Sequence, residues 1–383
     1  MEKILNRNLL VIGTASAALL SFMPSLAMAQ QGSASSVTIY GVMDAFVDVS
    51  RAGRGTVTRV GSGGGLGSRL GFMGREDLGG GLAAVFRIEQ GLTLDDGQLG
   101  QGGRAWGREA SVGLSSGALG TVQLGRLPTP YYGVLPGVDA FFWMGSGGLL
   151  SITRSGAATR QLSASGINAR HDNAVGYSSP VFSGFQVRAM VSAGEASTAI
   201  GRGYSWSARY SSGPIDALAG WVRQEGAGNA NGQADAWVVG GSYNFGAAKL
   251  YAGYTNDKNS CTTCTGALAR VAGVSATGAS HFKLMNLGVR VPVGAFTGIA
   301  QVVRVNDDTN YAVNPGDRDA TWVALGAEYN FSRRTVAFAS VGTIGNRNGS
   351  QYALGSGSVQ QPAAFVAGNS RSTTATLGIR HNF

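Results

Sequence analysis

The sequence predicts an all-β fold, a transmembrane, antiparallel, up-and-down β-barrel of sixteen strands, on three observations. The same strand ending occurs three times, at residues 239–245, 325–331 and 377–383, where mostly apolar residues alternate with polar or small ones up to a final Phe. This period of two indicates a strand with two different faces. Gly makes up 61 of the 383 residues and charged residues only 13%, against roughly 25% in typical soluble proteins. Short and long connections between the strands also alternate regularly.

The phenylalanine that closes each copy suggests where these strands end. Phe245, Phe331 and Phe383 each follow an Asn at the end of an apolar face. Aromatic rings settle at the two surfaces of a membrane, so a strand that crosses lipid is expected to end on such a ring.

The period-two pattern, bounded by Gly, Pro, Asn, Asp or Ser, identifies sixteen strands. In chain order they are residues 37–50, 66–76, 81–91, 106–115, 120–127, 168–179, 184–193, 203–212, 215–224, 235–245, 248–257, 281–291, 295–305, 319–331, 334–345 and 372–383. Short turns join alternate pairs, at residues 77–80, 116–119, 180–183, 213–214, 246–247, 292–294 and 332–333. Longer polar loops lie between these turns, including residues 51–65, 92–105, 128–167, 258–280 and 346–371. Turns at one end and loops at the other are typical of an outer-membrane barrel, whereas a soluble β-sandwich would not sort its loops by length.

The membrane environment predicts that the barrel is closed and which way the side chains of its strands face. Inside hydrocarbon every backbone N–H and C=O group needs a partner, so the last strand is expected to pair with the first. In residues 82–89 and 185–192, apolar residues alternate with others that include Arg87 and Arg188. The polar faces are expected to point inward, where sixteen strands leave a lumen wide enough for water and small solutes.

The first 29 residues have the pattern of a secretory signal peptide. Lys3 and Arg7 precede an apolar run, residues 9–20, and Ala27-Met28-Ala29 forms a small-residue cleavage site. We therefore expect one barrel domain, residues 30–383, exported to the outer membrane and surrounded by its lipid.

The excess positive charge is almost entirely arginine. Without residues 1–29, the chain keeps 28 basic and 20 acidic side chains, and only three of the 28 are Lys. An exported chain without a clustered Lys/Arg tract argues against nucleic acid as a partner. Arg holds its charge regardless of pH, and its flat fork suits carboxylate and phosphate.

Four short motifs lie near the strand ends: SVTIYG at 36–41, SRLGF at 68–72, EDLGGGL at 76–82, and LGR at 124–126 followed by Thr129-Pro130. Together with Phe383, they resemble the general diffusion porins of Gram-negative bacteria, especially the neisserial and burkholderial type. The resemblance covers essentially the whole mature chain. It implies a homotrimer of sixteen-stranded barrels, each with its own pore narrowed by an inward-folded third loop. It also implies that the outer-membrane assembly machinery recognises Phe383.

In this chain the third long loop spans about residues 128–167 and shows no strand pattern. A connection of this length is expected to be functional or disordered. Asp139 is its only acid, and its aromatic residues offer apolar surface for packing on the inner wall. They are Tyr131, Tyr132, Phe141, Phe142 and Trp143. The loop is expected to form the constriction, and a mobile outer loop is the alternative.

By motif position, the resemblance places the wall arginines of the constriction at Arg69, Arg108 and Arg170. Alternation also turns Arg170 inward, and turns Arg69 inward together with Arg75. Each arginine could instead be an ordinary solvated wall residue. Arg108 is the difficult one, since strict alternation puts it on the outward face unless a β-bulge lies near Glu109 or Ala110.

These features predict a channel and not an enzyme: a water-filled pore for passive diffusion of small hydrophilic solutes, with a preference for anions. Fixed arginine charge at a narrow throat raises the local anion concentration, and Asp139 facing the arginines would set a transverse field. The sequence also suggests two alternatives. A selective uptake channel for organic acids or phosphate stays open, because Tyr131, Tyr132 and Trp143 could line its route. An outer-membrane enzyme would need a convergent Ser/His or Asp/His set, and the sequence shows none.

The remaining motifs predict no catalytic site, no cofactor and no metal. Cys261 and Cys264 lie in the sixth long loop, and in an exported protein they predict a local disulfide, with two free thiols as the alternative. Residues 113–117 match the G-x-S-x-G pattern of hydrolases, but they end a strand and no helix follows. The three His residues are isolated and have no metal-binding spacing.

Overall fold

The structure is a computed structural model that describes residues 35–53, 55–154, 169–195, 200–226, 232–260, 280–309, 318–355 and 368–383. The predicted signal peptide, residues 1–29, and the predicted disulfide between Cys261 and Cys264 lie outside these residues. All described residues belong to one unit, Gly32–Phe383.

Within the described residues, seventeen β-strands form the main sheet. They are β1 (Ser36–Ala52), β2 (Thr56–Ser62), β3 (Arg69–Gly79), β4 (Leu82–Gly91), β5 (Glu109–Ser116), β6 (Gly120–Pro128), β8 (Arg170–Ser178), β9 (Phe185–Ser192), β10 (Ile200–Ser212), β11 (Ile215–Gly226), β12 (Gln233–Asn244), β13 (Lys249–Asn259), β14 (Ser280–Val293), β15 (Phe296–Asp307), β16 (Ala320–Asn330), β17 (Thr335–Asn346) and β19 (Arg371–Asn382). β2 and β3 both pair with β1, one with each half of it, so together they make a single barrel strand. The barrel therefore has sixteen strands.

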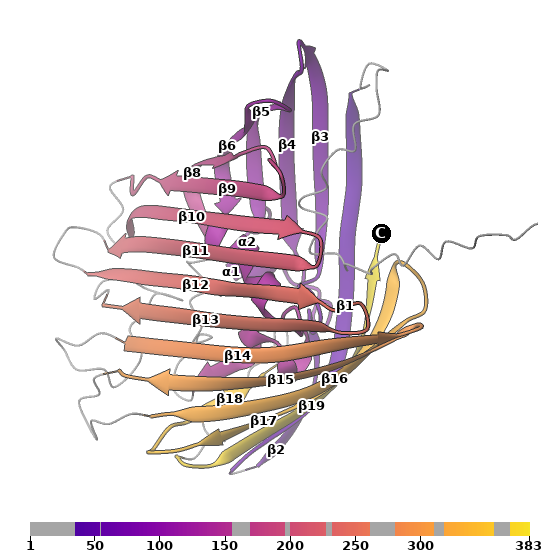
Figure 1. Cartoon of the computed structure of the whole chain (residues 1–383), viewed down its shortest axis with the longest axis vertical. Coiled ribbons are helices and arrows are strands. Elements are labelled where there is room, and N and C mark those ends of the chain that lie inside the picture. Colours follow the sequence, from indigo (N-terminus) through magenta and orange to yellow (C-terminus); the bar gives the residue numbers. More distant parts are fainter. Residues whose placement is uncertain are drawn as a thin grey trace, which may run out of the picture. The chain divides into compact units, whose positions relative to one another are not determined.

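Every neighbouring pair is antiparallel, and the ring closes where β1 meets β19 (Figure 1). The register at this seam runs from Val42↔Asn382 to Ala52↔Ser372. Beyond it, Gly41 and Phe383 exchange two backbone N–H···O hydrogen bonds of 3.1 Å. The predicted closed, sixteen-stranded, up-and-down barrel is confirmed.

The prediction of a long loop at residues 51–65 is wrong. β1 runs on to Ala52, and β2 returns beside it after a tight turn. Residues 56–60 are rich in β-branched side chains, which favour a strand. Arg59 of β2 also donates two hydrogen bonds to the Asp48 carboxylate of β1, with N–O distances of 2.8 and 2.7 Å. The glycines on both sides of β2 concealed this short strand in the sequence.

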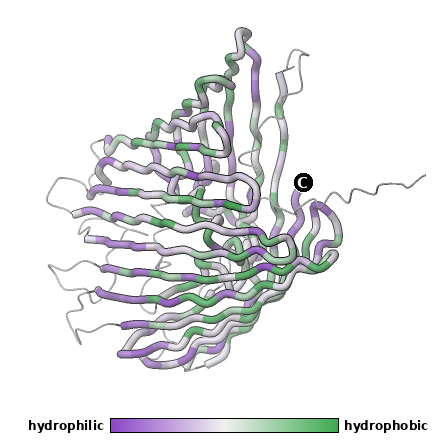
Figure 2. Tube along the Cα trace, in the orientation of Figure 1, coloured by the Kyte–Doolittle hydropathy of each residue, from purple (hydrophilic) through white to green (hydrophobic). Residues whose placement is uncertain are grey.

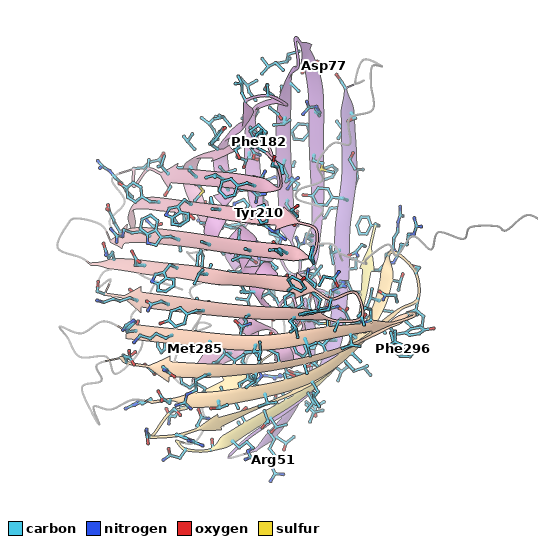
Figure 3. All side chains as sticks on the ribbon, in the orientation of Figure 1. Arg51, Asp77, Phe182, Tyr210, Met285 and Phe296 are labelled. Atoms are coloured by element: carbon cyan, nitrogen blue, oxygen red, sulfur yellow. The ribbon has the colours of Figure 1, made fainter. Side chains whose placement is uncertain are left out.

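The outer face is largely apolar and ends on aromatic rings at the short turns. Figure 2 shows hydrophobic and hydrophilic residues alternating along the strands, and Figure 3 labels two of the rings, Tyr210 and Phe296. Tyr243 contacts Phe245, and Phe296 contacts Tyr329, each with ring centroids 4.6 Å apart. These exposed rings lie where a membrane interface is expected.

The long loops hold further short elements. α1 (Gly100–Gly103) lies in the second loop, while α2 (Pro130–Val134) begins the third loop and is followed by single-turn 3₁₀ helices at Leu135–Val138, Gly145–Gly147 and Leu149–Ser151. The third loop then forms β7 (Ile152–Arg154), which pairs with β18 (Tyr352–Leu354) of the last loop. The sequence predicts neither β7 nor β18, because three residues are too few to show a period.

Candidate functional site

The third loop follows the inner face of β10–β17, which we name the docking wall. Hydrogen bonds fix the loop to successive strands of this wall. In order along the loop, they join Tyr131 N to Ser205 Oγ of β10 (3.1 Å), Val138 O to Asn286 Nδ2 of β14 (2.6 Å), Ala140 N to Gln301 Oε1 of β15 (3.0 Å), and Ser146 N to Ser340 Oγ of β17 (3.0 Å). The loop therefore lies inside the barrel, as predicted.

The docking wall has an apolar inner face beneath the loop. Val222, Val303 and Trp322 point inward from β11, β15 and β16 and are fully buried, as is Phe141 of the loop. Apolar side chains on the inner face of a wet barrel would contact water, and covering them with loop side chains is favourable. This apolar face explains why the loop lies against this side of the barrel.

Asp139 differs from its predicted place. It was expected to face the arginines, but its side chain is fully buried between the loop and the docking wall. Its carboxylate accepts the backbone N–H groups of Phe141, Trp143 and Leu149, at 3.0, 3.0 and 2.8 Å, and also Nε2 of Gln301. Burial raises the pKa of Asp139, although these hydrogen bonds oppose the rise. Asp139 therefore holds the turn of the loop and does not line the opening.

The three arginines predicted for the constriction come together in the structure. Arg69 of β3, Arg108 and Arg170 of β8 meet around Glu89 of β4 and Tyr132 of the loop, and we name these five residues the arginine cluster. Arg108 Nε lies 2.5 Å from Glu89 Oε1, and Arg69 Nη1 lies 3.7 Å from the same oxygen. Arg170 Nε donates to the Arg108 carbonyl (2.8 Å), and its guanidinium lies 5.2 Å from the centre of the Tyr132 ring.

Arg108 points inward without the predicted bulge. The expected strand 106–115 is too long, since β5 begins only at Glu109, and its register against β4 is unbroken from Glu109 onward. Arg108 lies before the strand, where alternation does not apply, and its N–H bonds the Glu89 carbonyl at 3.1 Å. Arg108 is 8% exposed.

Tyr132 joins the loop to the arginines. Its ring lies 4.7 Å from that of Trp143, so the start and the middle of the loop meet beside the cluster. Burial raises the pKa of Tyr132, but the charges of Arg170, Arg108 and Arg69 outweigh this effect and leave the pKa below its usual value.

The remaining predicted arginines surround the cluster. Arg75 is exposed on the inner face of β3, Arg87 lies 3.6 Å from Glu109, and Arg188 donates to Oε1 of Gln186 at 2.6 Å. Two further arginines, Arg104 and Arg126, share the carboxylate of Asp172. Arginines therefore outnumber acids on this side of the barrel.

Sequence reasoning missed two members of the cluster. Alternation places Glu89 on the inner face with Arg87, but nothing in the sequence shows that Glu89 is the acid that two arginines share. Tyr132 was predicted only as loop packing surface. Its contact with Arg170 depends on how the loop folds back, which a period in one segment does not reveal.

The chain matches the Gram-negative porin family over residues 15–349. It is 31% identical over 366 residues to outer membrane porin protein 32 of Delftia acidovorans, covering 93% of this chain and 95% of that protein. It is 29% identical over 377 residues to the major outer membrane protein P.IB of Neisseria lactamica, covering 95% and 97%.

Among solved structures, the anion-selective porin from Comamonas acidovorans is similar with a TM-score of 0.73 and 28% identity, over 91% of this chain and all of that one. The trimer form of OmpT, an outer membrane protein of Vibrio cholerae, shares the fold, with a TM-score of 0.65 and 18% identity over 92% of this chain and all of that one. The resemblance inferred from the sequence motifs is confirmed. This chain belongs to the Gram-negative porin family and forms a channel in the outer membrane.

Proposed function

We propose that this porin passes small hydrophilic solutes with a preference for anions, and that the arginine cluster sets this preference. The observation that supports it best is the cluster itself, in which Arg69 and Arg108 share one acid, Glu89, and Arg170 donates to the Arg108 carbonyl. Three guanidinium groups with one carboxylate leave a net positive charge beside the loop. The similar solved structure of an anion-selective porin also supports the proposal.

The mechanism is electrostatic. Arginine charges in a narrow region between low-dielectric walls raise the local concentration of anions and disfavour cations. Glu89 and the Arg108 carbonyl hold the guanidinium groups in place, so an arriving anion meets charges that are already oriented. The solute keeps part of its water and binds weakly enough to leave. No catalytic step is required, and we propose that the protein is not an enzyme.

The double substitution Arg69→Ser and Arg170→Ser tests the role of the cluster. The anion-to-cation permeability ratio, measured in planar bilayers under a KCl gradient, should fall at least about threefold. Arg59→Ser with Arg209→Ser removes the same charge from arginines that each pair with one acid, Asp48 or Asp216, and is the matched control. If both double variants change selectivity equally, or neither does, the cluster does not set the preference.

A selective uptake channel for organic acids or phosphate is a second candidate function. The aromatic pair Tyr132–Trp143 beside Arg170 supports it, because it offers an apolar surface next to a fixed positive charge. Such a channel should show flux that saturates with the concentration of an organic acid, or brief current blocks in its presence. Conductance that rises linearly with every salt tested would favour simple diffusion.

The homotrimer is part of the same proposal. On β1–β6, the exposed large side chains of the outer face are mostly aliphatic, and at the short turns Leu78, Leu82 and Leu119 lie where other strands place aromatic rings. An aromatic girdle marks contact with lipid. Because this sector has leucines in place of those rings, it suits contact with a neighbouring copy of the chain. A heat-modifiable trimer band should appear in unboiled gels, and a conducting monomer would refute the oligomer.

Export and assembly complete the proposal, with residues 1–29 removed as a signal peptide and Phe383 recognised by the assembly machinery. The Phe383 ring packs over Gly41 at the seam, where a Cβ on Gly41 would lie 2.4 Å from the ring. Deleting Phe383 should therefore lower the amount of inserted protein more than the conductance of each inserted channel. Normal insertion of the truncated protein would contradict this role.

A further inference from the structure

The second barrel strand is interrupted between β2 and β3 by a glycine segment, Gly63–Ser68. Ser62 and Ser68 close its base, with their Oγ atoms 2.9 Å apart, while the residues between them leave the wall. Gly64 reaches the third loop, since its carbonyl accepts the N–H of Gly145 at 2.5 Å. The glycine segment is therefore a second inward element, which comes from the wall and not from a long loop.

Asp44 of β1 holds the glycine segment in this shape. Its side chain is fully buried, and Oδ2 accepts the N–H groups of Gly65 and Leu66, both at 2.9 Å. Its backbone also exchanges two hydrogen bonds of 3.0 Å with the Ser68 hydroxyl. Hydrogen bonds to a charged acceptor are stronger than neutral ones, so Asp44 contributes a large share of the stability of this shape.

The glycine segment in turn contacts two arginines of the cluster. The Gly67 carbonyl accepts the Nε–H of Arg69 at 2.9 Å. Gly67 also lies against Arg108, because a Cβ on Gly67 would be 3.1 Å from Nη1 of that arginine. The absence of a side chain at Gly67 thus leaves room for the Arg108 guanidinium, and the shape of the segment sets the direction of Arg69.

We infer that Asp44 is a positioning residue for anion selection, acting through the glycine segment on Arg69 and Arg108. This inference rests on the proposed role of the arginine cluster. Without Asp44, the amides of Gly65 and Leu66 lose their acceptor, the segment shifts, and the two guanidinium groups lose the contacts with the segment that fix their direction together with Glu89. The arginines stay charged, but the charge is spread over more positions and acts less strongly on a passing anion.

The sign of the effect separates positioning from simple charge. Removing a carboxylate from the inner wall should raise anion preference if only the sum of charges matters. Positioning predicts the opposite for Asp44→Ala: the anion-to-cation permeability ratio should fall at least about twofold. Asp48→Ala is the matched control, since Asp48 is on the same face of β1, is equally buried, and pairs with Arg59 away from the segment. It should leave the ratio unchanged or raise it.

A second variant perturbs the segment without changing any charge. A Cβ on Gly65 would lie 2.7 Å from Oδ2 of Asp44 and 3.1 Å from Nη1 of Arg380, so Gly65→Ala must displace the segment from its acceptor. The ratio should fall as for Asp44→Ala, with more open-channel noise. This variant also tests the inference if Asp44→Ala yields no folded trimer in unboiled gels.

Each outcome has one meaning. A fall in the ratio for Gly65→Ala and for folded Asp44→Ala, together with no fall for Asp48→Ala, supports the inference. An unchanged or higher ratio for either segment variant overturns it. If the double variant Arg69→Ser with Arg170→Ser also leaves the ratio unchanged, the proposed role of the arginine cluster is wrong. If the double variant lowers the ratio while the segment variants do not, only the inferred role of Asp44 is wrong.

Discussion

The two sides of the barrel's inner face use the same alternating pattern for different purposes. On the docking wall, inward residues such as Val222, Val303 and Trp322 are apolar and buried under the third loop. On β3–β9, the inward positions include Arg69, Arg87 and Arg188. The docking wall is made of long strands, with a register shift only at one end of the β10–β11 pair, whereas the arginine side contains the interruption at the glycine segment and a register shift between β6 and β8.

The difference shows how the side chains of a barrel can decide on which side of the lumen a loop lies. Apolar residues on one side of a wet lumen draw the loop to that side, because covering them removes their surface from water. The arginine side stays polar. Its guanidinium groups are oriented by carbonyl and carboxylate partners, and these partners do not require regular strands. A barrel with equal sides would offer the loop no preferred position.

The largest expected effect comes from weakening the docking wall. Phe141 is fully buried, and its ring packs on Gly147 and Gly326. Phe141→Ala should cost about 3–5 kcal/mol of loop docking. We expect higher single-channel conductance with several substates, measured in planar bilayers. Phe296→Ala removes an exposed ring from the outer face of β15, outside the β1–β6 sector, and should leave the conductance unchanged. A single, unaltered conductance for Phe141→Ala would show that the apolar wall does not hold the loop.

A smaller effect concerns the arginine side and depends on pH. The three arginines lower the pKa of Tyr132, so its phenolate should form below the ordinary tyrosine value of about 10. The phenolate adds a negative charge while the arginines stay protonated, so anion preference should fall as the pH rises toward that value. Reversal potentials from pH 7 upward measure this change. Tyr132→Phe should remove the fall, and a Phe variant with the same pH profile would contradict the assignment.

Most of the barrel follows from the sequence because period-two patterning, turn residues and closure are local or general constraints. The inward facing of Arg69 and Arg170, and the inward path of the third loop, could also be predicted. Arg108 could not, because its direction depends on the residue at which β5 begins. β2 escaped notice because glycines flank a strand that is stabilised by its pairing with β1.

The position of Asp139 shows a different limit. As the only acid in the third loop, it was expected to balance the arginines across the opening. A carboxylate can equally satisfy the backbone N–H groups of a tight turn, and the structure uses Asp139 in this way. Composition counts charges, but only the fold shows which charges are already engaged. The acid within the cluster is Glu89.

The most direct test is the reversal potential of the unmodified protein in a planar bilayer under a KCl gradient at neutral pH. We expect a potential of the sign set by Cl⁻, because arginine charge exceeds acid charge in the cluster. A potential of the sign set by K⁺ would contradict the central claim that the arginine cluster selects anions.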